Sequence, residues 1–234
     1  MVRQITCLMI AAAVALVPSA ARAQQHEHGA QPADRLGKVH FETSCNPAVR
    51  DSFDRAVALL HSFWFAASID AFTDVAKRDP GCAMAHWGVA LGVWGNPLGG
   101  TRTPQSMARG RAAVDQAKTV GAKTEREREY IAAVEALYAG EGDQFAHAGA
   151  YEKVMATIVA KYPKDTEAQV FHANALDASA DPADKTYAKQ LQAAKALEKV
   201  MATQPDHPGV THYLIHSYDY PPLADKGLPA ARRY

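Results

Sequence analysis

The chain has 234 residues, of which 48% are hydrophobic and 8% aromatic. This composition is typical of an alanine-rich helical protein and excludes an intrinsically disordered chain. Its 25 lysines and arginines balance 25 acidic residues, and a near-neutral mixed surface argues against binding to nucleic acid or to anionic lipid. The length suits one or two globular domains, or one short solenoid.

The first 23 residues have the pattern of a secretory signal peptide. Arg3 precedes an apolar core from Cys7 to Val17, and the small-residue motif Ala21-Arg22-Ala23 follows it. The apolar core is too short to span a membrane, although an uncleaved anchor is the alternative. Cleavage after Ala23 leaves 23 basic and 25 acidic residues, so the mature chain has a net charge of −2. We therefore expect a periplasmic or secreted protein.

Residues 24–45 are predicted to form a flexible tail, because residues 24–37 are polar, contain Pro and Gly, and show no hydrophobic period. Cleavage after Ala23 would place His26 third in the mature chain. A free amine, two amide nitrogens and that imidazole form a square-planar site of the kind that Cu(II) or Ni(II) prefers, and His28 adds a further imidazole. A shifted cleavage site or cyclisation of Gln24 would abolish this site, which leaves a plain tail as the alternative.

A helical hairpin follows the tail. Apolar residues at spacings of three and four predict one helix over residues 47–64 and a second over residues 67–77. Asp79-Pro80 ends the second helix, because proline disfavours the α conformation of the residue before it. Another helix opens at Ala83, and small residues alternate with large ones along it. Each helix has one apolar face, so the pair needs stacked neighbours to bury it.

Local start and stop signals divide the rest of the chain into further helices. A Gly/Pro-rich loop over residues 95–104 is a candidate functional insertion, with an inert connection as the alternative. Thr124 and Glu127 form a capping-box pattern at the start of one helix. The other signals are starts at Thr103-Pro104, Asp165, Asp181-Pro182 and His207-Pro208, and stops at Gly121, Tyr162-Pro163 and Gln204-Pro205.

The hairpin resembles the tetratricopeptide (TPR) repeat in its run Ser68-Ile69, Phe72, Val75, Asp79-Pro80, Trp87-Gly88 and Leu91. The resemblance implies an all-α, right-handed superhelix of about five antiparallel helix pairs over residues 46–234. The segments HSFWFAASIDAF, DPGCAMAHWGVAL and PGVTHYLIHSYDYPPLADKGLPAARRY also resemble a group of secreted bacterial TPR-type proteins, which are generally longer. Because the sequence stops inside an apparent helix, we expect the last repeat to be incomplete and the chain to be C-terminally truncated.

Signal cleavage would leave two cysteines, Cys45 and Cys82, in an oxidising compartment. Each precedes the first helix of adjacent repeats, and such helices stack in parallel, so a structural disulfide is the first expectation. Two buried free thiols and a reactive or metal-bound pair remain as alternatives.

His212 and His216 lie four residues apart in HYLIHSYD and therefore share one helix face, which is the spacing of metal ligands. Tyr213 stands where the zinc-peptidase pattern requires Glu, so that chemistry is not supported. Zinc, copper or nickel binding, contact with another ligand, and plain helix packing all remain open. The TPR resemblance implies a ligand groove lined by the first helix of each repeat, with Val89, Val170, Asn174, His212 and His216 as candidates.

No phosphate loop, nucleophile elbow or CxxC motif occurs in the sequence. The sequence therefore predicts a periplasmic or secreted, non-catalytic TPR-type scaffold that holds a protein, peptide or small ligand in its concave groove. The alternative is a metal-binding protein that uses His212 and His216, or His26 and His28. A hydrolase with catalytic residues in a missing C-terminal part is a third reading.

Overall fold

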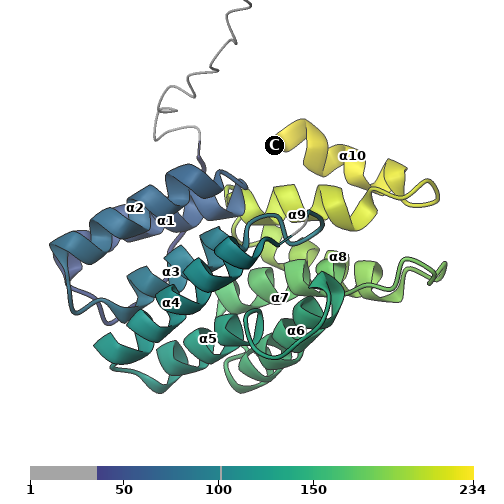
Figure 1. Ribbon diagram of the computed structural model, residues 1–234. Helices are drawn as coiled ribbons and strands as arrows, with labels where there is room; N and C mark the ends of the chain where they lie inside the picture. Colours follow the sequence, from purple (N-terminus) through teal and green to yellow (C-terminus); the bar gives the residue numbers. More distant parts are fainter. Residues whose placement is uncertain (1–35, 101) are drawn as a thin grey trace, which may run out of the picture. The chain divides into compact units, whose positions relative to one another are not determined.

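Ten α-helices and one 3₁₀ helix, without any strand, make up the described part of the chain, residues 36–100 and 102–234 of a computed structural model (Figure 1). The all-α prediction is confirmed. The helices are η2 (Pro47–Val49), α1 (Arg50–His61), α2 (Phe65–Arg78), α3 (Ala83–Trp94), α4 (Pro104–Val120), α5 (Glu125–Ala136), α6 (Gln144–Lys161), α7 (Thr166–Ala178), α8 (Ala188–Met201), α9 (Pro208–Tyr218) and α10 (Ala224–Arg233).

Side-chain caps set the starts of α4, α5 and α7 where the sequence predicts them. Thr124 and Glu127 form both bonds of a capping box at the start of α5. The Thr103 side chain caps α4 in front of Pro104, and the Asp165 side chain accepts from the Ala168 amide at the start of α7. These caps satisfy amides that the helix itself leaves unpaired.

Two helix boundaries differ from the prediction because single residues take up the left-handed conformation. Phe63 has φ 58° and ends α1 before residue 64, and Tyr187 has φ 54° and precedes α8. The predicted start at Asp181-Pro182 is therefore six residues too early. There the Asp184 side chain accepts from the amide and hydroxyl of Thr186, and such local bonds compete with helix formation.

The prediction of a flexible tail up to residue 45 is wrong for the described residues 36–45. Phe41 is fully buried, and its ring centroid lies 5.1 Å from that of Trp87 and 5.0 Å from that of Tyr130. This extended segment packs through isolated residues such as Phe41. It therefore lacks the regular spacing of apolar residues by which a helix can be recognised in a sequence. The predicted signal peptide and the candidate copper or nickel site at His26 and His28 lie outside the described residues.

Helices that follow one another in the sequence pack against one another, and α1 additionally packs against α9 (Figure 1). One buried core extends over α1–α7 and a second over α7–α10. A disulfide joins Cys45, in front of η2, to Cys82, which caps α3. Over the described residues, no helix combines the length and the apolarity that crossing a membrane requires.

Candidate functional site

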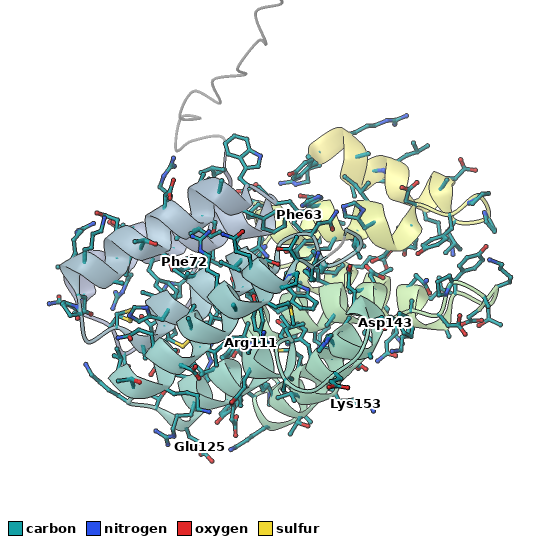
Figure 2. All side chains as sticks on the ribbon, in the orientation of Figure 1. Phe63, Phe72, Arg111, Glu125, Asp143 and Lys153 are labelled. Atoms are coloured by element: carbon teal, nitrogen blue, oxygen red, sulfur yellow. A yellow bond between two sulfur atoms is a disulfide. The ribbon has the colours of Figure 1, made fainter. Side chains whose placement is uncertain are left out.

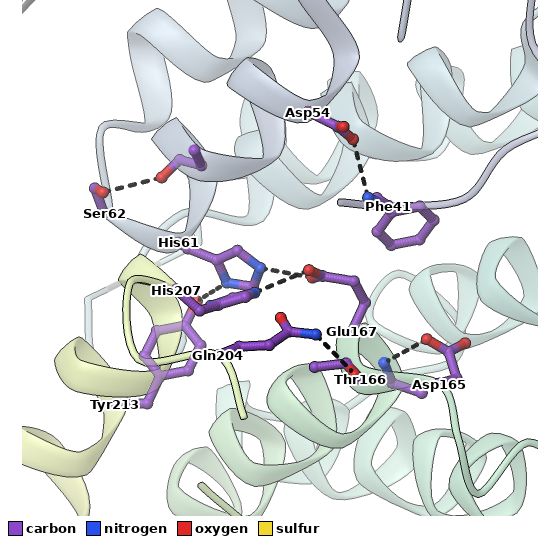
Figure 3. Close-up of polar contacts among 12 residues, drawn as sticks. Phe41, Asp54, His61, Ser62, Asp165, Thr166, Glu167, Gln204, His207 and Tyr213 are labelled. Atoms are coloured by element: carbon purple, nitrogen blue, oxygen red, sulfur yellow. Dashed lines mark hydrogen bonds and ion pairs between the residues drawn. The ribbon is translucent and has the colours of Figure 1, made fainter. Parts of the chain in front are cut away.

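A buried polar network joins three helix ends at the contact between α1 and α9 (Figure 3). His61 is the last residue of α1, Glu167 lies in the first turn of α7, and His207 caps α9. The Glu167 carboxylate accepts from Nε2 of His61 at 2.9 Å and from Nε2 of His207 at 2.8 Å. All three residues are at most 2% exposed, so this interaction takes place away from water.

The carboxylate fixes the protonation of this network. A carboxylate only accepts, so both histidines must carry a hydrogen on Nε2, and Nδ1 of His61 accepts from the Tyr213 hydroxyl at 2.9 Å. Burial lowers the pKa of His61, and Glu167 only partly offsets that effect. Burial alone would raise the pKa of Glu167, but its bonds and charge interactions with His207 and His61 hold that pKa at about 2. The start of α7 also favours a negative charge on Glu167.

The same three residues offer ligand atoms to a metal, because one nitrogen or oxygen from each lies within 4.8 Å of the others. Two histidines and a glutamate form a recognised zinc ligand set. In this structure, however, the distances of 2.8 and 2.9 Å match ordinary hydrogen bonds, which account for the cluster without an ion. A second group, of Cys45, Asp79 and Cys82, has both sulfurs in the disulfide and thus offers no thiolates.

His212 and His216 form a second histidine cluster one turn further along α9. Their Nε2 atoms are 3.1 Å apart, and Nδ1 of His212 donates to the His61 carbonyl at 2.7 Å. That bond places the neutral ring's lone pair on Nε2, facing His216, as in metal-bound histidines whose other nitrogen donates to a carbonyl. Burial lowers the pKa of both rings, so they are neutral at pH 7. Elsewhere in the described residues, no Cys, His or carboxylate completes a three-residue ligand group with this pair.

Phe63, which lies in the α1–α2 connection (Figure 2), contacts both histidines of this pair. Its ring stacks on His216 with centroids 5.7 Å apart and meets His212 edge-on at 4.4 Å. The left-handed position that closes a helix is normally occupied by glycine. A phenylalanine there costs backbone energy, and its ring contacts with α9 provide the compensation.

Two adjoining cavities lie beside this pair. One is a narrow apolar pocket whose walls include Leu60, Phe63, Trp94, Asn174 and Tyr213. The other is open, with a volume of about 520 Å³, and it shares Pro97 and Ala178 with the first. Its walls come from the α3–α4 loop, α6, α7, the α7–α8 loop, α8 and the C-terminal end of α9 with the two residues that follow it: Pro97, Leu98, Gly99, Gln144, Phe145, Asp177, Ala178, Ala180, Pro182, Gln190, His216, Asp219 and Tyr220.

The groove candidates differ in where they lie. Asn174 lines the apolar pocket and His216 lines the open cavity, while His212 contacts His216. Val170 is 0% exposed in the second core and therefore cannot face a groove. Val89 is half-buried against the first core and lines neither cavity. The groove expectation for Val170 thus fails, because α7 turns that side toward α9.

Sequence reasoning missed Glu167 and His207. In the sequence, Glu167 looks like an ordinary acidic residue in the first turn of a helix. His207 looks only like the residue that precedes a helix-starting proline. Their partners are distant in the chain, 106 residues from Glu167 to His61 and 40 residues from Glu167 to His207. No local spacing connects such residues, so only the packing of α1, α7 and α9 reveals the cluster.

Comparison with family models gives no match for this chain. No curated protein and no solved structure is significantly similar to it.

Proposed function

We propose that this chain is a periplasmic or secreted, non-catalytic scaffold of TPR-like architecture that binds a protein, peptide or small ligand in the open cavity. The observation that carries the proposal is the cavity of about 520 Å³ next to the apolar pocket. Volumes of this order, with mainly apolar walls and a few polar groups, are typical of ligand sites.

The side chains on the rim support this proposal. Phe145 is 44% exposed at the mouth of the cavity, and an exposed aromatic ring beside a cavity is a common contact for a partner.

The architecture and the N-terminal sequence are consistent with the other parts of the proposal. Successive packing of neighbouring helices is what a right-handed stack of about five helix pairs requires. The signal-like residues 1–23 support export.

Site-specific photo-cross-linking tests the proposal. Phe145 is replaced by photoreactive p-benzoylphenylalanine, and the exported protein is irradiated in the cells that secrete it. We expect a discrete adduct that disappears when Ala178→Trp fills the wall shared by the two cavities. Ala150→Trp, at an exposed position of α6, is the matched control and should leave the adduct intact. An adduct that survives Ala178→Trp would reject binding in this cavity.

A second candidate function is metal binding at His212 and His216. It is favoured by the 3.1 Å separation of their Nε2 atoms and by the carbonyl that orients His212. The remaining coordination positions would be filled by water or by a ligand in the cavity, as in sites that keep an open position.

Metal content of untagged mature protein, exported by its own signal and purified without chelator, tests this candidate. We expect about one equivalent of zinc, copper or nickel, lost in His212→Ala/His216→Ala and retained in His86→Ala. A variant that lacks residues 24–28 separates this site from the tail site at His26 and His28. Protein without stoichiometric metal would reject both metal sites.

A further inference from the structure

The open cavity contains two buried polar side chains that are only half satisfied by their neighbours. Asp177 is 9% exposed; its Oδ2 accepts from the Ser217 hydroxyl at 2.6 Å, but its Oδ1 has no partner within residues 36–100 and 102–234. Gln190 is 3% exposed, and its carboxamide meets only the Tyr220 hydroxyl. A hydroxyl both donates and accepts, so one end of the Gln190 carboxamide stays unpaired in either orientation.

Such orphaned groups are costly unless something pairs with them. Both side chains line the cavity, and both end in a torsion with a broad energy minimum. The unpaired atoms themselves are shielded, and a rotation about that torsion is what would bring each of them to an occupant of the cavity. This is an independent sign that the cavity accommodates a polar ligand group.

The charged residues around the cavity indicate whether that ligand group is positive or negative. Asp177 and Asp219 line the cavity, His216 is neutral, and none of the described lining residues is Lys or Arg. Asp177 lies in the last turn of α7 and Asp219 caps the C-terminus of α9, so two negative helix ends meet there. The N-terminus of α6 also borders the cavity, but the Asp143 side chain already caps it.

We infer that the open cavity binds a primary ammonium group, with Asp177 and Asp219 as its counter-ions and with Gln190 and the rings of Phe145 and Tyr220 around it. This inference rests on the proposed ligand-binding function and names the chemistry of the ligand. An ammonium group has three donors and no acceptor, which matches carboxylate oxygens and helix-terminal carbonyls. Aromatic faces add a cation–π attraction.

The protonation state of Asp177 makes binding of an ammonium group depend on pH. Burial raises the pKa of Asp177 well above its ordinary value, and the Ser217 bond only partly opposes this. The other titratable groups of the cavity are His216, Asp219 and Tyr220, and Lys189 on α8 bonds Ser179 beside it. An ammonium ion needs the ionised carboxylate, so its binding is expected to tighten as pH rises through the raised pKa of Asp177. A ligand that accepts a hydrogen bond from protonated Asp177 would tighten as pH falls.

Titration followed by NMR and calorimetry tests this inference on the whole mature chain. The probes are N-acetyl-lysine-N-methylamide, which represents a lysine side chain, cadaverine, which represents a free amine, and N-acetyl-norleucine-N-methylamide, which lacks the charge. We expect the lysine derivative or cadaverine to bind at least ten times more tightly than the norleucine derivative, and more tightly at pH 8 than at pH 6. The tighter of the two charged probes identifies the source of the ammonium group.

Variants locate the counter-ions. Asp177→Asn should weaken binding of the charged probe about tenfold or more and remove its pH dependence, consistent with one lost charge-assisted bond. Asp219→Asn at the exposed rim should weaken it less and cannot compromise the core. Asp70→Asn on the exposed face of α2 is the matched control and should change nothing.

Two outcomes would overturn the inference in distinguishable ways. If the norleucine derivative binds as well as the lysine derivative, and Ala178→Trp abolishes both, the cavity binds ligands but does not select an ammonium group. If no probe binds and the photo-adduct survives Ala178→Trp, the ligand-binding function itself fails as well.

Discussion

Gly209 shows how one missing side chain positions the buried network. A Cβ atom on this residue would lie 2.6 Å from Nδ1 of His61 and 3.0 Å from Cγ1 of Val170. Contacts below 3.0 Å require the neighbour to move, and here that neighbour is a ring held by two hydrogen bonds, with a core valine in tight contact beside it. The first turn of α9 can therefore approach α1 only because residue 209 is glycine.

We predict that Gly209→Ala lowers the free energy of unfolding by about 1–3 kcal/mol, the usual cost of overpacking a core. Urea denaturation measures the change. Gly149→Ala is the matched control: it lies within α6 with nothing within 4 Å of the added carbon, and alanine there should stabilise the helix by roughly 0.5–1 kcal/mol. Equal effects at the two positions would contradict the close contact between α9 and His61.

The buried network also predicts how stability depends on pH. His61 has a folded pKa below its ordinary value of 6.5, so the unfolded chain takes up that proton first as pH falls. Glu167 has a folded pKa of about 2 against an ordinary 4.5, which acts in the same direction. Both groups thus make the fold more stable at neutral pH than in acid, and stability declines below about pH 6.5 because of His61 and between 4.5 and 2 because of Glu167.

Glu167→Gln tests this assignment. The variant keeps the size of the side chain but loses the charge, so we expect lower stability at pH 7 and a flatter pH dependence between 4.5 and 2. Urea midpoints measured across this range report both effects. A variant whose midpoint falls with acid as steeply as that of the original protein would show that other carboxylates dominate the acid response.

At the scale of helices, the disulfide between Cys45 and Cys82 connects the segment in front of η2 to the start of α3 across 37 residues. Closing a loop of that length removes unfolded-state entropy, and the chain-entropy estimate is about 3–4 kcal/mol. The segment next to it packs through the Ser44 amide and hydroxyl, which both donate to Glu127. The covalent link therefore adds to a contact that already orders this segment.

We predict that Cys45→Ser/Cys82→Ala lowers the free energy of unfolding by about 3 kcal/mol, a typical loss for one native disulfide. Guanidinium denaturation with and without reductant measures it. Reductant should destabilise the original protein to a similar extent and leave the double variant unchanged. A protein indifferent to reductant would indicate that the bond is absent in solution.

Helix positions are largely predictable from this sequence because their signals are local. The Thr124–Glu127 capping box, the Thr103-Pro104 start and the Asp165 cap each involve residues within a few positions of one another. The His212–His216 pair is local too, and its two rings do meet. The helix boundaries at Phe63 and Tyr187 were predicted wrongly because both residues are left-handed. Phe63 packs against distant side chains, and Tyr187 follows a turn held by local Asx bonds.

At the scale of the whole described unit, the contact between α1 and α9 matters most. Neighbour packing alone would let a helical array unfold in parts. Here Glu167 bonds His61 across 106 residues, and Tyr213 bonds the same ring across 152 residues. These contacts could not be predicted from the sequence, because no local pattern around either residue indicates which distant residue it will contact.

We predict that this contact makes the helical unit unfold as one cooperative unit. All three tryptophans, Trp64, Trp87 and Trp94, lie between the end of α1 and the end of α3, so fluorescence reports the N-terminal half while far-ultraviolet circular dichroism reports every helix. The two urea transitions should coincide in the original protein. Glu167→Ala leaves two buried imidazole donors unpaired and breaks the connection between α1, α7 and α9, so the transitions should then separate. Separate transitions in the original protein would mean that α1–α3 unfold independently and that the buried network contributes only local packing.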